Sequence, residues 1–366
     1  TLLGVAGWRW IFYINIPFGI LALVLTSASL HVNIARHAHK IDYIGAVLLV
    51  GAAVSLLMCV SVYGPQDGWK DAHTLSTGFG ALLLTLLFLW QERRAAEPIL
   101  PLGLFRNHTF SLTSALGFII GAGMFGAIVM LPLYLQLVKG NSATESGLKL
   151  IPFMIGIVST SIISGKLISK HGHYKRFPLI GLVLVTIGIT LMSTLKEDTP
   201  FWELAIYAVM IGAGLGFSMQ TIVIALQNSV HFTEMGIATS ANTFFRSIGS
   251  TIGVAVFGSI YANRLAHYIP QAIDELKATN PAALAGASPE AFEQLKNNSA
   301  VLETFTPELK ASILHAFVQS FHVVFLAAAP VTAVGFVLAL FLRETPLRTG
   351  QSFEAAKDEA TGEMYG

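Results

Sequence analysis

One charged side chain inside an apolar run is the sharpest chemical signal in the sequence. Arg246 lies in the stretch over residues 236–262, and a charge at the centre of a bilayer costs roughly 2.5–3.5 kcal/mol on insertion scales. Such a residue normally faces a helix-bundle interior or a cavity and has a partner. Asn242, four residues earlier, shares its helical face, so we expect it to help hold the guanidinium. Two roles for Arg246 stay open, a gating or coupling residue and an anchor that reaches the membrane interface.

Uncharged polar side chains inside or at the ends of apolar runs form a second group. A cavity for lipophilic molecules needs aromatic walls and a few polar groups rather than a charged trap. Tyr134, Gln136 and Gln220 are therefore candidates for the wall of such a path. The alternative is that they form hydrogen-bonded contacts between helices, and the sequence leaves both open.

The sequence shows no signature of an enzyme, a metal centre or a cofactor. The eleven histidines form no metal-ligand spacing, and Cys59 is the single cysteine. There is no phosphate-binding loop, dinucleotide turn or nucleophile elbow. A net charge of +1 gives no reason to expect a nucleic-acid partner. We therefore expect neither catalysis nor a bound cofactor.

The composition indicates which elements must position these residues. Of 366 residues, 54% are hydrophobic and 12% are charged, whereas soluble proteins have about 25% charged residues. An open sheet could not satisfy its backbone in lipid, so we predict an all-α polytopic membrane protein. The apolar stretches long enough to span a bilayer number nine and cover residues 9–30, 43–63, 74–91, 110–138, 146–169, 177–195, 202–228, 236–262 and 314–342.

Small and helix-breaking residues indicate how these spans pack and end. Small residues predict close contacts between helices in lipid; they are Gly117, Gly121, Gly212, Gly214, Gly216, Gly249 and Gly253. Asp42 is expected to cap the second span. Pro132 and Pro152 should bend the fourth and fifth spans.

The long segment over residues 262–313 contains four prolines and scattered charges, so we predict an external loop with short amphipathic helices. Ser288-Pro289-Glu290 and Thr306-Pro307-Glu308 each have the pattern of an N-cap, an N1 proline and a first-turn acid. The second is expected to open the last span.

Basic residues are concentrated in alternate short loops, which the positive-inside rule places in the cytoplasm. The resulting orientation has a cytoplasmic C-terminus and an external 262–313 segment. The basic set is Arg36, Lys40, Arg93, Arg94, Arg106, Lys170, Lys175, Arg176, Arg343 and Arg348.

Residues 7–19 read G-W-R-W-I-F-Y-I-N-I-P-F-G. This string resembles the stretch between the fifth and sixth helices of the fourteen-helix drug:proton antiporter branch of the major facilitator superfamily. Residues 42–45, 97–106, 131–136, 147–152 and 236–253 resemble later segments of the same family, in the right order. The resemblance covers nearly the whole chain.

The resemblance implies a major facilitator fold in which the nine spans correspond to helices 6–14. Residues 1–30 would hold the last helix of the N-terminal bundle, and 31–109 a two-helix central linker. Residues 110–342 would form the six-helix C-terminal bundle, with the external loop at 262–313, and 343–366 a cytoplasmic tail. Since the chain begins at Thr1, we expect the family's first five helices, with the proton-coupling acid, to belong to a missing N-terminal part.

In function, the resemblance implies a secondary transporter that exports lipophilic drugs or toxic compounds by proton-coupled alternating access. It would lie in a bacterial cytoplasmic membrane, with the lipid bilayer, small lipophilic substrates, protons and the missing N-terminal helices as partners. Two alternatives stay open: an exporter of a single endogenous metabolite, and a non-transporting membrane sensor with the same fold.

Residues 165–176 resemble a degenerate copy of the superfamily's cytoplasmic loop motif. Gly165 and Gly172 match its glycines, and Lys170 takes the place of a basic residue, with Lys175 and Arg176 following. Ser169 stands where the motif has an acid, so the resemblance does not carry a charge-relay role to this copy. The alternative is an ordinary positively charged loop.

Overall fold

The computed structural model describes residues 13–29, 42–64, 68–95, 97–284 and 299–347. Helices and the short loops between them make up these residues, with no strand among them. The chain divides into two units, residues 1–41 and 42–366. The first contains α3 (Asn15–Ser29), and the second contains the other described helices.

Each of the nine predicted spans overlaps a described helix, and the polytopic all-α prediction is confirmed. Among the described residues, seven helical stretches are long and apolar enough to cross a membrane, and two apolar helices, α3 and α10, are shorter. The elements of the second unit are α4 (Tyr43–Leu57) continued by η1 (Met58–Tyr63), α6 (Ala72–Glu92), α7 (His108–Leu137), α8 (Ala143–Leu148), α9 (Ile151–His171), α10 (Arg176–Met192), α11 (Phe201–Ser229), α12 (Met235–Thr279) and α14 (Pro307–Leu340).

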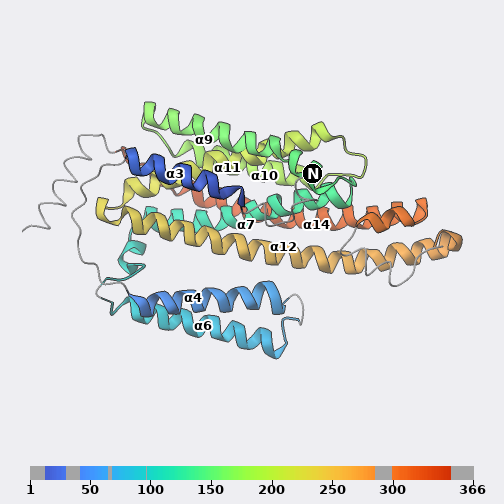
Figure 1. Ribbon diagram of the computed structural model, residues 1–366, viewed down its shortest axis with the longest axis horizontal. Coiled ribbons are helices and arrows are strands. Elements are labelled where there is room, and N and C mark those ends of the chain that lie inside the picture. The colour runs from blue at the N-terminus through green and yellow to red at the C-terminus, as the bar shows by residue number, and fades with distance from the viewer. Residues whose placement is uncertain (1–12, 30–41, 65–67, 96, 285–298, 348–366) are drawn as a thin grey trace, which may run out of the picture. The chain divides into compact units, whose positions relative to one another are not determined.

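Helices α4 and α6 form an antiparallel pair (Figure 1). As predicted, Asp42 caps α4, because its Oδ1 accepts the Gly45 N–H at 2.9 Å. The same oxygen accepts a hydrogen bond from Gln91 Nε2 at 3.1 Å, which joins the two helices. At the end of α6 the buried Glu92 carboxylate accepts the backbone N–H groups of Ile99 and Leu100 at 3.2 and 3.1 Å. These contacts fix the chain where it enters α7.

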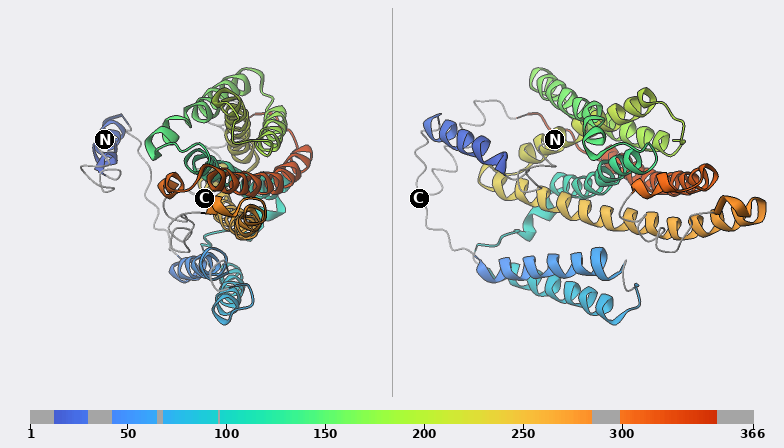
Figure 2. Two further views of the ribbon diagram at one scale, coloured as in Figure 1. Left: turned by 90° about the vertical axis from the view of Figure 1, so that its right-hand side faces the viewer. Right: turned by 45° about the vertical axis from the view of Figure 1, so that its right-hand side comes forward.

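Helices α7, α9, α10, α11, α12 and α14 pack into one bundle (Figures 1 and 2). Its core is a continuous apolar cluster drawn from all of these helices. Tyr134 of α7 is fully buried in it, and its ring packs edge-on against Phe321 of α14. A bundle of this kind buries every backbone polar group within its own helices, as a membrane interior requires.

Glycines let the backbones of neighbouring helices touch, as the sequence predicted. A Cβ on Gly121 of α7 would lie 2.1 Å from the Arg246 carbonyl oxygen of α12, and one on Gly249 of α12 would lie 2.1 Å from the Phe118 carbonyl oxygen of α7. In α11 the glycines alternate between two partners. Gly212 lies against Phe153 of α9, whereas Gly214 lies against Gly181 of α10. No larger residue fits at these positions without separating the helices.

The predicted external loop over residues 262–313 is wrong in its first third. Helix α12 continues unbroken through Pro270 to Thr279 (Figure 1). Pro270 removes one backbone hydrogen bond, but it lies on the exposed side of the helix, where water can bind the released carbonyl. The extension is stabilised by burial of Leu276 in a cluster with Ala283, Phe305 and Leu309. This cluster joins the far end of α12 to the start of α14.

Pro152 does not bend a span as predicted. A short helix, α8, ends at Leu148, and α9 begins at Ile151 with Pro152 in its first turn, where a missing N–H costs nothing. The Thr306 prediction is confirmed, since its side chain accepts the Leu309 N–H and Pro307 opens α14. The matching pattern at 288–290 lies outside the described residues. Pro132 lies inside α7, as predicted.

Candidate functional site

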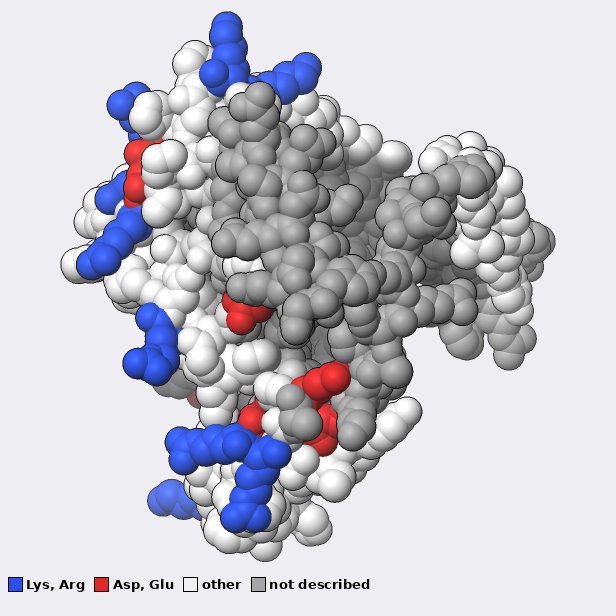
Figure 3. Space-filling model, turned by 90° about the vertical axis from the view of Figure 1, so that its left-hand side faces the viewer, with Lys and Arg blue, Asp and Glu red and all other residues white. Residues whose placement is uncertain are grey.

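Basic side chains gather at one end of the bundle, which we call the basic end: the end where α9 finishes and α10 begins. Figure 3 shows Lys and Arg around the rim of this face. The starts of α7 and α12 and the ends of α6, α11 and α14 lie at the same end (Figure 1). This arrangement brings together the described basic loops; they contain Arg93, Arg94, Arg106, Lys170, Lys175, Arg176 and Arg343.

Arg246 lies about 17 Å along α12 from Met235, level with Gly121 in the middle of α7. Its side chain is half-buried. In the part of the chain that the structure describes, the guanidinium makes no hydrogen bond or ion pair. Arg246 therefore lies beside the middle of α7 and not at either end of the bundle.

Asn242 does not hold Arg246, contrary to our prediction. Its side chain is 3% exposed, and its Nδ2 donates to the Thr113 carbonyl oxygen of α7 at 2.7 Å. The amide also fills the space beside Gly117. Asn242 therefore joins α12 to α7. Loss of this acceptor would leave a buried amide without a partner and would lower the free energy of unfolding by about 1–3 kcal/mol.

The three candidates for a path wall lie in different surroundings. Tyr134 is fully buried, and its hydroxyl donates to the Lys196 carbonyl oxygen at 2.7 Å; this is the helix contact that the sequence left open as the alternative. Gln136 is half-buried near the end of α7, and Gln220 is exposed on α11. Among the described residues, none of the three forms a hydrogen bond with Arg246.

The loop motif forms the turn between α9 and α10. Gly172 ends α9 in the left-handed conformation, with φ of 75°, which favours glycine. Lys170 and Arg176 are exposed, Lys175 is half-buried, and Gly165 lies on α9 with open space where a Cβ would be. The basic residues therefore present charge to solvent, and the one glycine whose conformation matters here is Gly172.

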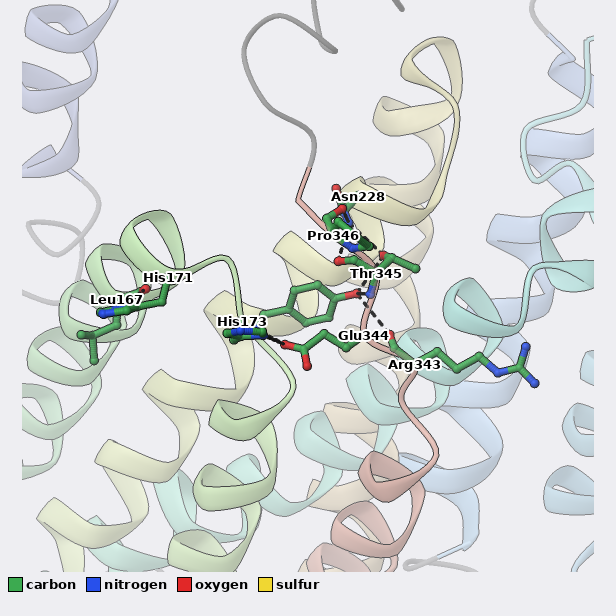
Figure 4. Close-up of polar contacts among 9 residues, drawn as sticks. Leu167, His171, His173, Asn228, Arg343, Glu344, Thr345 and Pro346 are labelled. Carbon is green, nitrogen blue, oxygen red and sulfur yellow. Dashed lines mark hydrogen bonds and ion pairs between the residues drawn. The ribbon is translucent and has the colours of Figure 1, made fainter.

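Residues that the sequence did not single out hold this loop. The segment after α14, residues 343–347, crosses the loop, and we call it the C-terminal strap (Figure 4). The Tyr174 N–H donates to Glu344 Oε1 at 2.9 Å, and the Tyr174 hydroxyl donates to the Arg343 carbonyl oxygen at 3.1 Å. The Thr345 N–H donates to the same hydroxyl at 3.0 Å. Thus Glu344, from the segment after α14, supplies a carboxylate to this loop.

The strap also reaches α11 and is charged on its outer side. Asn228 Nδ2 donates to Thr345 Oγ1 at 2.9 Å and to the Pro346 carbonyl oxygen at 3.0 Å. His173 Nδ1 lies 3.3 Å from Glu344 Oε1, and Figure 4 shows the two side chains pointing toward one another. A cavity of about 710 Å³ lies between the loop and the strap. Four helix ends are thereby joined at the basic end.

Polar contacts at the opposite end join the loop after α7 to the loop after α10. Lys139 Nζ donates to the Glu197 carbonyl oxygen at 2.5 Å. Burial lowers the pKa of Lys139, although the nearby Asp198 carboxylate opposes this shift. His315 of α14 lies 3.3 Å from Glu197, and His322 Nδ1 is bonded to the Ser193 carbonyl oxygen. The bundle is thus fastened at both ends.

Comparison with known families agrees with this architecture. The profile of the major facilitator superfamily matches residues 1–254. The chain belongs to the major facilitator superfamily. It is an integral membrane protein of the major facilitator fold, and its family and fold are those of a transporter rather than an enzyme.

Two members of the superfamily from bacteria are similar to this chain in sequence. An uncharacterized MFS-type transporter of Mycobacterium tuberculosis is 37% identical over 340 residues, which cover 93% of this chain and 48% of that protein. A multidrug transporter protein of Bacillus subtilis is 33% identical, over 96% of this chain and 68% of that one. The chain therefore spans about half the length of the mycobacterial relative.

A solved structure supports the same fold. The structure of this chain is similar, with a TM-score of 0.51, to the crystal structure of a bacterial homologue of the human lysosomal transporter Spinster. That structure is in an inward-facing and occupied conformation. The match covers 82% of this chain and 68% of that one at 13% identity. At this identity the likeness supports the fold alone.

Proposed function

We propose that the protein is a proton-coupled exporter of lipophilic drugs or toxic compounds that works by alternating access. The observation that carries the proposal is similarity over almost the whole chain to a multidrug transporter protein of Bacillus subtilis. The bundle is consistent with this role, because its helices are joined by backbone-to-backbone contacts and by polar contacts at both ends. Such a bundle can move as one body.

The proposal includes the fourteen-helix architecture. Residues 1–30 would then complete an N-terminal bundle, 31–109 would hold the linker pair α4 and α6, and 110–342 would form the C-terminal bundle. The proton-carrying acid is assigned to the N-terminal bundle, because the described spans of the C-terminal bundle carry acids only near their ends; these are Glu203, Asp274, Glu275 and Glu308. The basic end would be cytoplasmic.

Energy supply is adequate for this function. Each elementary charge that crosses 100 mV supplies about 2.3 kcal/mol. Since 1.4 kcal/mol corresponds to a tenfold concentration ratio, one proton per cycle sustains an outward gradient of roughly fortyfold.

The first test is export by the full-length protein in efflux-deficient cells. Cells would be loaded with a panel of fluorescent lipophilic compounds, neutral and of both charges, and then energised. We expect loss of at least one compound that stops when a protonophore collapses the gradient. No loss above empty-vector cells, with the protein shown to be in the membrane, would contradict broad drug export and favour a single-metabolite exporter or a sensor.

A further inference from the structure

The charge of Arg246 is placed where it can act on a molecule beside α12. The residue lies level with the middle of the apolar helix α7, is half-buried, and has no bonded partner in the described ranges. A guanidinium cannot face hydrocarbon at this depth without a large cost, so it must face water, a polar partner or a bound molecule. The exposed surface around it shows which of these environments it has.

The exposed face of α12 differs from that of the outer helices. Helices α9, α10 and α14 expose large apolar side chains along their length, which suits contact with lipid; among them are Met154, Val158, Ile162, Ile180, Ile187, Leu326 and Val334. Along α12, which is described throughout, the exposed large hydrophobic residue is Val256. Near Arg246 the exposed side chains are Ser240, Thr243 and Ser247. This face is polar at a depth where lipid would require apolar residues.

Two of the three hydroxyls on this face, those of Thr243 and Ser247, already donate their protons within α12. Thr243 Oγ1 donates to the Thr239 carbonyl oxygen at 3.0 Å, and Ser247 Oγ donates to the Thr243 carbonyl oxygen at 2.9 Å. Both hydroxyls therefore offer only lone pairs to the outside. A molecule on this face would meet hydrogen-bond acceptors along the helix and one full positive charge at Arg246.

The full charge decides which molecules this face favours. The described residues include no carboxylate on α12 beside Arg246. They also include none in the middle parts of the other bundle helices, α7, α9, α10, α11 and α14. The guanidinium charge is therefore not neutralised by these helices. A charge acts more strongly than a hydroxyl dipole in a medium of low dielectric constant. A lipophilic cation is therefore repelled, whereas an acidic oxygen is attracted and neighbouring O–H or N–H groups can donate to the hydroxyls.

We propose that Arg246 and the polar face of α12 line the substrate path and select lipophilic molecules with an acidic or strongly accepting oxygen, such as phenols, enols and carboxylic acids, over lipophilic cations. The inference rests on the proposed export function and names its substrate class. Arg246 is then a specificity-determining residue.

Two ions of the same shape and opposite charge provide the test. Binding of tetraphenylborate and of tetraphenylphosphonium to the purified full-length protein would be measured by calorimetry. At a separation of about 8 Å and an effective dielectric constant near 20, Arg246 should favour the anion at least about tenfold. Arg246→Gln should reduce the ratio to within about twofold, and Arg246→Lys should preserve it. Arg264→Gln, an exposed arginine on the same helix, is the matched control and should leave the ratio unchanged.

The opposite results are equally clear. Equal or tighter binding of the cation by the natural protein, an unchanged ratio in Arg246→Gln, or no binding of either ion would overturn the inference. Export of a neutral compound by the same cells separates this failure from failure of the proposed function. If proton-driven export persists while the preference is absent, only the assignment of Arg246 fails.

Discussion

Tyr174 is the residue on which the contacts at the basic end depend most. It is fully buried, and its hydroxyl bonds two backbone groups of the C-terminal strap. The ion pair beside it, His173 with Glu344, is 66% and 33% exposed, and pairs this exposed contribute about 0–1 kcal/mol. The buried hydroxyl should therefore matter more than the visible charge pair.

We predict that Tyr174→Phe lowers the free energy of unfolding by about 1–3 kcal/mol, because the Arg343 carbonyl and the Thr345 N–H lose their partner. His173→Ala should cost less than about 1 kcal/mol. Thermal unfolding of the two variants in one detergent would measure the difference. Equal effects would show that the charge pair, not the hydroxyl, holds the strap.

Sequence reasoning found the loop but not what holds it. Gly172 was identified from the motif, and its φ of 75° is one that favours glycine. Tyr174 and Glu344 are 170 residues apart, and no spacing rule connects positions that far apart. The signals that existed were an aromatic residue among basic ones and an acid directly after the last span.

For Arg246, too, the sequence predicted the position of the residue but not its contacts. Hydropathy predicted that it lies inside a membrane span, and the structure places its backbone beside Gly121 in the middle of α7. Its partner could not be inferred from periodicity, because Asn242 bonds to α7 instead. Helical spacing says which residues share a face but not which neighbour that face meets.

Among the elements, the contact between α7 and α12 depends most on residue size. We predict that Gly121→Ala lowers the free energy of unfolding by about 1–3 kcal/mol, because the added Cβ would lie 2.1 Å from the Arg246 carbonyl oxygen and must force the helices apart. Gly165→Ala is the control. It has open space, and alanine favours a helix by up to about 1 kcal/mol over glycine.

Thermal unfolding in detergent, with size-exclusion chromatography to follow aggregation, would compare the two variants. Similar stability of both would show that α7 and α12 can separate at no cost. Loss of stability in Gly165→Ala alone would contradict the described packing.

The boundaries of helices were predictable for segments that span the bilayer and not for segments expected to lie in water. Spans within the bilayer have a characteristic length and hydropathy, and all nine predicted spans overlap described helices. The outer part of α12 lacks that signal, since exposed Pro270 and charged Lys277 resemble a loop. What keeps it helical is burial of Leu276 in the same apolar cluster as Leu309, which joins positions distant in the sequence. Pro152 likewise needed the three-dimensional turn between α8 and α9 to be interpreted.

At the scale of the whole molecule, the orientation in the membrane can be tested directly. We predict that a cysteine at Lys170 reacts with a membrane-impermeant maleimide only after cells are permeabilised, since the basic end should be cytoplasmic. A cysteine at Lys277, exposed at the far end of α12, should react in intact cells. Cys59, the single cysteine of this chain, would be replaced by alanine in both.

The reverse labelling pattern would invert the topology. Reaction of both positions in intact cells would contradict a membrane-spanning arrangement of the intervening helices.

The length of α12 has a mechanical consequence. Its 45 residues form a rod of about 67 Å, more than twice the roughly 30 Å of a hydrocarbon core. A tilt of about 10° pivoting at Met235 would carry Thr279 through roughly 12 Å, whereas Arg246 would move by only about 3 Å. Any tilt of the bundle about its basic end is thus about four times larger in displacement at Thr279 than at Arg246.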